Sequence, residues 1–185
     1  MAVTIDGTTG VSAVQAGVVT FAALASGVPT RAQLPAGSVL QVVQSVKTDT
    51  SSFAIGATGD ISGLSVSITP TLSTSKVLVT FCLQGSTAYD GILNLYRDAT
   101  AIGQGDAAGS RRRGIAEFPQ TSTAGSTATA AVSFLDSPAT TSSVTYKIQA
   151  VMDGAAGYVN RSQTDADAVY DPRLSSSITV MEIAA

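Results

Sequence analysis

Apolar and polar side chains alternate along most of this chain. Between Val144 and Met152 the apolar residues occupy every second position, and Thr145, Lys147 and Gln149 lie between them. Successive side chains of a β-strand point to opposite faces, so this segment predicts a half-buried antiparallel strand.

The same periodicity of two predicts further strands after residue 37. They are Leu40–Val46, Leu64–Thr69, Val77–Leu83, Leu93–Leu95, Ala128–Phe134 and Ser176–Ile183. In the first of them, Leu40, Val42 and Val46 alternate with Gln41, Val43 and Ser45. Eight to ten short strands separated by turns are typical of an antiparallel β-sandwich of the jelly-roll kind, rather than an α/β fold.

Two turn signals separate the predicted strands. Arg97-Asp98-Ala99-Thr100 predicts a hairpin turn, and Asp136-Ser137-Pro138 predicts a turn in which proline presets φ and Asp136 caps the backbone. The fold class expected from these patterns is all-β.

Residues 1 to 37 differ from the rest of the chain. They are rich in Gly, Ala, Val and Thr and contain Pro29 and Pro35. We expect no core of their own here, and we predict an extended N-terminal arm over residues 1–37 followed by a β-sandwich head over residues 38–185. A flexible tail is the alternative interpretation of the arm.

Charge is scarce in this sequence. Of 185 residues 12% are charged, about a quarter are Ser or Thr, and the net charge is −3. A charge-poor surface indicates either exposed strands rich in Ser and Thr or a surface covered by partner subunits. The acidic balance disfavours a nucleic-acid binder. The apolar run Val18–Leu24 is too short for a membrane span and follows no basic segment, so we expect no membrane partner.

The residue types of catalytic and metal sites are largely missing. The chain has no His and one cysteine, Cys82, which we interpret as a small core or interface residue. We therefore predict no enzymatic activity, no catalytic residue and no cofactor. Asp165, Asp167 and Asp171 could bind Ca²⁺, but their spacing lacks the Gly and distal Glu of an EF-hand loop, and a solvated loop is the favoured interpretation. We predict no metal site.

Arg111, Arg112 and Arg113 form the densest charge cluster, in a Gly-rich loop. A solvated loop, or inter-subunit pairs with Asp98 or Asp106, is the favoured interpretation, and contact with an acidic partner surface or phosphates is the alternative. Asn160-Arg161-Ser162 matches a glycosylation acceptor, which we interpret as a chance match because no secretion signal precedes it.

Several longer runs resemble a β-sandwich domain of virion proteins of tailed phages, a domain that often occurs at the ends of tail fibres. The runs are Leu34 to Thr50, Gly63 to Pro70, Ser73 to Val79, Leu95 to Gly103, Phe134 to Thr141 and Ser177 to Ile183. The resemblance covers residues 34 to 185. It implies a compact homotrimer of the jelly-roll kind seen in complement-like and tumour-necrosis-factor-like heads, with no catalytic residues to carry over.

The short segment before the head distinguishes two virion roles. It shows no coiled-coil heptads or long repeats, which favours a capsid decoration (cement) protein on the outer capsid surface over the receptor-binding tip of a tail fibre or tailspike. We expect synthesis in the host cytoplasm, partnership with the major capsid protein lattice, and a host-surface glycan as a further candidate ligand. The predicted contacts of the arm with the capsid or a neighbouring protomer are Val14, Val18, Val19, Phe21 and Leu24.

Overall fold

The computed structural model describes residues 34–185. Most of the predicted arm, including Val14, Val18, Val19, Phe21 and Leu24, lies outside the described residues. The strands are β1 (Val39–Lys47), β2 (Ser51–Phe53), β3 (Thr58–Ile68), β4 (Lys76–Thr87), β5 (Gly91–Arg97), β6 (Thr100–Ile102), β7 (Ala116–Glu117), β8 (Ala128–Asp136), β9 (Val144–Met152), β10 (Gly157–Val159) and β11 (Ser176–Ile183).

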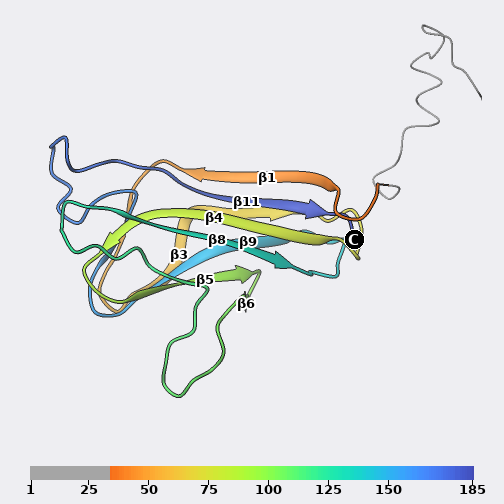
Figure 1. Ribbon diagram of the computed structural model, residues 1–185, viewed down its shortest axis with the longest axis horizontal. Coiled ribbons are helices and arrows are strands. Elements are labelled where there is room, and N and C mark those ends of the chain that lie inside the picture. Colours follow the sequence, from red (N-terminus) through yellow and green to blue (C-terminus); the bar gives the residue numbers. More distant parts are fainter. Residues whose placement is uncertain (1–33) are drawn as a thin grey trace, which may run out of the picture. The chain divides into compact units, whose positions relative to one another are not determined.

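These strands form two antiparallel sheets packed face to face, as Figure 1 shows. In the first sheet β1 pairs with β11, β11 with β4 and β4 with β8, while the short β10 pairs with β2 and β4. In the second sheet β9 lies between β3 and β5, and β5 also pairs with β6 and β7. The predicted β-sandwich is confirmed. No helix among residues 34–185 could cross a lipid bilayer.

The core lies between the two sheets and consists of the alternate residues of each strand. Val79, Phe81 and Leu83 from β4 meet Tyr146 and Ile148 from β9, and each is at most 4% exposed. β9 begins and ends where the periodicity predicts because its inward positions are all apolar and buried. β11 also has the predicted bounds, although its buried face carries Ser176 and Glu182 beside Ile178 and Val180.

The face of β1 that carries Val42 and Val46 is exposed, and the opposite face is the buried one. Val43 packs against the core, whereas Val42 and Val46 are 56% and 53% exposed. Both faces of this strand carry valine, so the sequence alone does not reveal which one is buried. The packing against β3 places the side of Val43 inward, since β1 and β3 are in contact across the sandwich.

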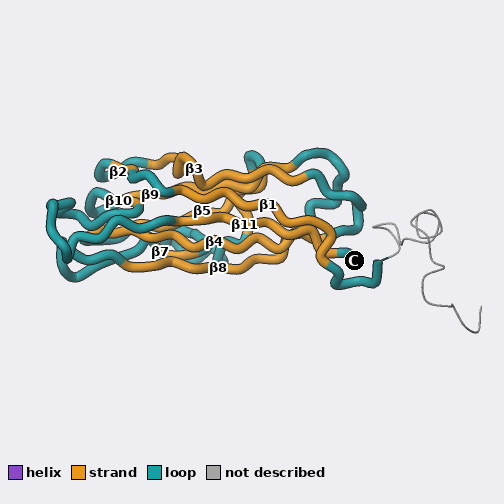
Figure 2. The backbone as a smooth tube through the Cα atoms, turned by 90° about the horizontal axis from the view of Figure 1, so that it is seen from above, coloured by secondary structure: helices purple, strands orange, loops and turns teal. Residues whose placement is uncertain are grey.

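The two ends of the sandwich differ, as Figures 1 and 2 show. At one end Gly37 donates a backbone hydrogen bond to Ala184 at 2.7 Å, and Lys76 at the start of β4 lies opposite Ile183 at the end of β11. We call this the terminal end. At the other end β4 finishes at Thr87, and the turn of residues 88–90 leads into β5. We call this the loop end.

A buried carboxylate fastens the terminal end. Glu182 is 0% exposed, and its two oxygens accept hydrogen bonds from the Thr71 amide at 2.6 Å, the Gln41 side-chain amide at 2.6 Å and the Thr71 hydroxyl at 3.0 Å. Burial raises the pKa of Glu182, but the hydrogen bonds from Gln41 and Thr71 outweigh it and hold the pKa below its ordinary value.

Replacing Glu182 by glutamine should destabilise the fold and flatten its acid dependence. The NH₂ group of the new carboxamide is a donor and would face the donors of Gln41 or Thr71 without a hydrogen bond, which should lower the free energy of unfolding by about 2 kcal/mol. Because the folded pKa of Glu182 is depressed, its carboxylate stabilises the native state above its unfolded pKa, and this contribution is lost as pH falls through the folded pKa. Urea unfolding of the wild type and E182Q at neutral and acidic pH measures both effects. An unchanged wild-type-to-variant difference between the two pH values would contradict the assignment.

Candidate assembly face and loop-end groove

The outward face of the first sheet carries no charge over a broad area. Residues paired in register across four strands form three rows on this face, and we call these twelve residues the uncharged face. The rows are Val42, Met181, Leu78 and Leu135; Gln44, Thr179, Thr80 and Ser133; and Val46, Ser177, Cys82 and Ala131. All twelve side chains are exposed or partly exposed.

The outward face of the second sheet provides the contrast. There Lys147 on β9 forms an ion pair with Asp60 on β3 at 2.7 Å, and its ammonium lies 5.7 Å from the Tyr96 ring. Lys147 also lowers the pKa of Asp60 by a direct hydrogen bond. The outward face of the second sheet therefore carries charged pairs that suit contact with water, whereas the uncharged face of the first sheet carries none.

The surface of the uncharged face is uneven. A hollow of about 290 Å³ lies over Cys82, with the small side chains of Ala131 and Ser177 on either side. The row that contains Leu78 and Leu135 stands beside it. The face therefore offers both apolar projections and a depression that apolar groups can enter. Cys82 is half-exposed on this outward face, so it is not a core residue, and its role at an interface stays a prediction.

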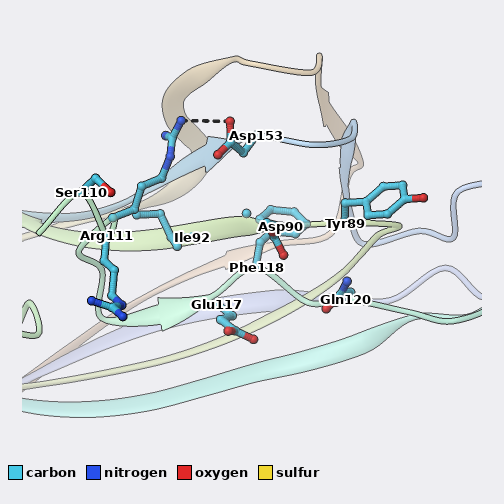
Figure 3. A pocket seen from close by; sticks show the side chains of 11 residues that line it. Tyr89, Asp90, Ile92, Ser110, Arg111, Glu117, Phe118, Gln120 and Asp153 are labelled. Atoms are coloured by element: carbon cyan, nitrogen blue, oxygen red, sulfur yellow. Dashed lines mark hydrogen bonds and ion pairs between the residues drawn. The ribbon is translucent and has the colours of Figure 1, made fainter. Parts of the chain in front are cut away.

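The arginine cluster lies at a groove near the loop end, drawn in Figure 3. Arg112 forms an ion pair with Asp153 at 3.0 Å, Arg113 donates to the Gly105 carbonyl at 2.6 Å, and Arg111 donates to the Ala108 carbonyl at 3.3 Å. Among residues 34–185 none of the three arginines pairs with Asp98 or Asp106, and Asp98 instead accepts a hydrogen bond from the Thr145 amide at 2.9 Å; the pairs expected between subunits stay a prediction. All three arginines are exposed, and Arg111 and Arg112 line the groove.

The three aspartates considered for Ca²⁺ do not converge. Asp165 pairs with Arg173 at 2.7 Å and with Arg161 at 3.3 Å. Asp171 instead accepts hydrogen bonds from the Ser162 and Thr164 hydroxyls, which lower its pKa. Within residues 34–185 no group of three candidate ligands could hold a metal ion.

Asn160, the residue of the glycosylation match, has a structural role instead. It is fully buried, with a φ of 61°, and its amide donates to the carbonyls of Lys47 and Asp49 at 2.9 Å each. Its side-chain oxygen accepts from the Ser176 hydroxyl at 2.6 Å. Asn160 therefore ties the β10–β11 loop to the end of β1, and asparagine is one of the few residue types that tolerate a left-handed backbone.

Comparisons with known proteins add no family to these observations. No protein-family model matches this chain, and a search of curated proteins finds no similar sequence.

Proposed function

We propose that this chain is a non-enzymatic structural protein of a phage virion, a homotrimeric decoration (cement) protein on the outer capsid surface. The observation that carries the proposal is the uncharged face. A sheet face that stays in water ordinarily carries interspersed charges, and twelve adjacent outward positions on four strands carry none.

A second copy of the chain is the occupant that best fits this face. A charged partner would be desolvated against it without gaining an ion pair, whereas an uncharged patch of a neighbouring copy incurs no such cost. Closure into a threefold ring requires that different parts of this surface meet, one from each neighbouring copy. The projections beside Leu78 and the hollow over Cys82 give one copy both shapes that the other needs. Three rows on four strands span roughly 400 Å² of flat area, about half of the about 800 Å² that a partner contributes to a standard interface.

The proposal that the protein belongs to a virion is supported by the family resemblance of residues 34–185. The proposal that it binds the capsid lattice is supported by the composition of the arm. The arm contains apolar side chains such as Val18 and Phe21 and only two charged residues before residue 34, Asp6 and Arg31. Apolar groups gain about 25 cal/mol for each Å² removed from water. We propose that the arm gains this energy by docking onto the major capsid protein or a neighbouring protomer.

The receptor-binding tip of a tail fibre or tailspike is the second candidate. The exposed side chains of Ile55, Tyr89 and Tyr170 in the loops favour it, because exposed aromatic and aliphatic groups mark interaction surfaces. The two candidates share a trimer and differ in where it is attached and in how many copies a particle carries.

Deleting residues 2–33 should abolish binding to capsids that lack this protein and leave the trimer intact, because the described strands and core lie after residue 33. Co-sedimentation with purified bare capsids measures binding, and analytical ultracentrifugation measures the trimer. Mass spectrometry of wild-type particles should count hundreds of copies. A few trimers confined to the tail would contradict the decoration role and support the fibre tip.

A further inference from the structure

A second interaction surface lies at the loop end, away from the uncharged face and from the terminal end. The register fixes this separation: Lys76 of β4 lies opposite Ile183 near the C-terminus, whereas Thr87, eleven residues later, lies opposite Gly157. The turn of residues 88–90 therefore projects at the end opposite the terminal end, as Figure 1 shows.

Exposed large apolar side chains gather in the loops of this end. Ile55 follows β2, Tyr89 follows β4, and Val169 and Tyr170 lie between β10 and β11. Tyr89 is 63% exposed and Tyr170 is 73% exposed. None of these residues belongs to the uncharged face, so assembly through that face would leave them accessible.

A groove of about 510 Å³ opens beside Tyr89 (Figure 3). Its volume lies in the range of small-molecule sites. Gly91, Ile92 and the buried Phe118 form its apolar floor, and the carboxylates of Asp90 and Glu117 line it. Glycine is required at position 91 because a Cβ there would lie 2.9 Å from Met152 and 3.0 Å from Phe118, both of which are buried.

The polar groups of the groove divide into engaged and free ones. Arg112 and Asp153 neutralise each other across 3.0 Å. Asp90 and Glu117 are exposed and make no ion pair or side-chain hydrogen bond within residues 34–185. Gln120 donates to the Ala88 carbonyl at 3.4 Å, which places its amide above the same turn. The groove thus presents two unused acceptors and an amide over an apolar floor.

We propose that this groove binds a neutral, hydroxyl-rich saccharide. Sugar hydroxyls donate to carboxylates and exchange hydrogen bonds with an amide, and the C–H face of a pyranose ring packs on apolar and aromatic groups. Charge decides the class of saccharide. Three carboxylates, Asp90, Glu117 and Asp153, face two guanidinium groups, those of Arg111 and Arg112. This balance repels sulfated or uronic polymers and leaves neutral sugars favoured.

The proposal rests on the second candidate function, the binding of a host-surface ligand, and names its chemical class. It is independent of assembly, because no residue of the groove belongs to the uncharged face. A saccharide site at the loop end would give a particle-bound trimer three weak contacts to a polysaccharide, whose combined avidity exceeds that of any one.

The experiment uses the full chain and defined trisaccharides. Isothermal titration with maltotriose, cellotriose, mannotriose and triacetylchitotriose probes neutral sugars, and trigalacturonate probes an anionic one. We expect saturable millimolar binding to at least one neutral trisaccharide and none to trigalacturonate. The double variant D90N/E117Q should weaken binding by about tenfold, as expected from losing two charge-assisted hydrogen bonds.

Matched controls separate this site from nonspecific effects. D106N/D167N makes the same charge change at two exposed carboxylates outside the groove and should bind like the wild type. Tyr89→Ala tests the rim without changing charge and should also weaken binding, with its melting curve confirming a folded chain. Absence of binding to every neutral trisaccharide, preference for trigalacturonate, or equal affinity of D90N/E117Q and D106N/D167N would each overturn the proposal.

Discussion

Replacing Asp136 with alanine is expected to lower the free energy of unfolding by about 3 kcal/mol, the largest stability loss that we expect from a single polar residue of the sandwich. Asp136 is 7% exposed at the end of β8. It accepts two hydrogen bonds from one nitrogen of Arg97, at 2.9 and 3.0 Å, and one from the Tyr146 hydroxyl at 2.7 Å. Because β8 belongs to the first sheet and the other two residues to the second, this carboxylate joins the two sheets.

The physical cost comes from the partners that remain. Without Asp136 the Arg97 guanidinium, whose side chain is 27% exposed, loses its counter-charge. The fully buried Tyr146 hydroxyl loses its acceptor. Burial and the hydrogen bond to Asp136 raise the pKa of Tyr146, so this hydroxyl stays protonated and is a donor without a partner in the variant.

Calorimetry or urea unfolding at one fixed protein concentration measures the change, which corresponds to roughly 6–12 °C in melting temperature for a domain of this size. Tyr146→Phe removes one donor and leaves the ion pair, so we expect a smaller loss of about 1 kcal/mol. Ser137→Ala, one residue further at an exposed position, should have little effect. A loss below about 1 kcal/mol for D136A would show that the network adds no net stability.

Asp136 also illustrates what the sequence could and could not predict. Its place before Ser137-Pro138 correctly indicates the end of a strand, but the prediction that Asp136 caps the turn is wrong. The carboxylate is used by Arg97 and Tyr146, which are neighbours in the second sheet through the pairing of β5 and β9. A contact between sheets depends on which strands oppose each other, and alternation within one strand does not contain that information.

The strands themselves were predictable where one face is apolar and the other is polar. The bounds of β9 agree with the predicted Val144–Met152 because its apolar positions are continuous. The bounds of β11 agree with the predicted Ser176–Ile183 although Ser176 and Glu182 share its buried face. For β1 the sequence does not show which face is buried, because both faces carry valine, and only the contact with β3 determines it.

The two candidate sites were predictable to different degrees. The alternation already indicates that Thr80, Thr129 and Ser133 point outward, but only the pairing of β4 with β8 and β11 shows that the outward positions of these strands form one uncharged face. The groove was indicated only through Arg111 and Arg112. Its carboxylates Asp90, Glu117 and Asp153 are far apart in the sequence and meet because β5 pairs with both β7 and β9.

A single charge at the centre of the uncharged face is expected to disperse the assembly without unfolding the chain. Thr80 occupies the middle row on β4, between Thr179 of β11 and Ser133 of β8. Thr80→Lys would bury an ammonium among groups that offer no counter-charge, and its desolvation would cost several kcal/mol per interface. We therefore expect association weakened by at least about a hundredfold, which 2.8 kcal/mol produces.

Sedimentation velocity over a micromolar concentration series should show wild-type trimers and Thr80→Lys monomers, with unchanged far-ultraviolet circular dichroism because this side chain points away from the core. Ser67→Lys introduces the same charge on the outward face of the second sheet, beside Thr145, and should remain trimeric. If Thr80→Lys stays trimeric while Ser67→Lys dissociates, the second sheet forms the subunit contact. If wild-type chains are monomeric both in solution and on particles, the uncharged face has another occupant and the trimer proposal is wrong.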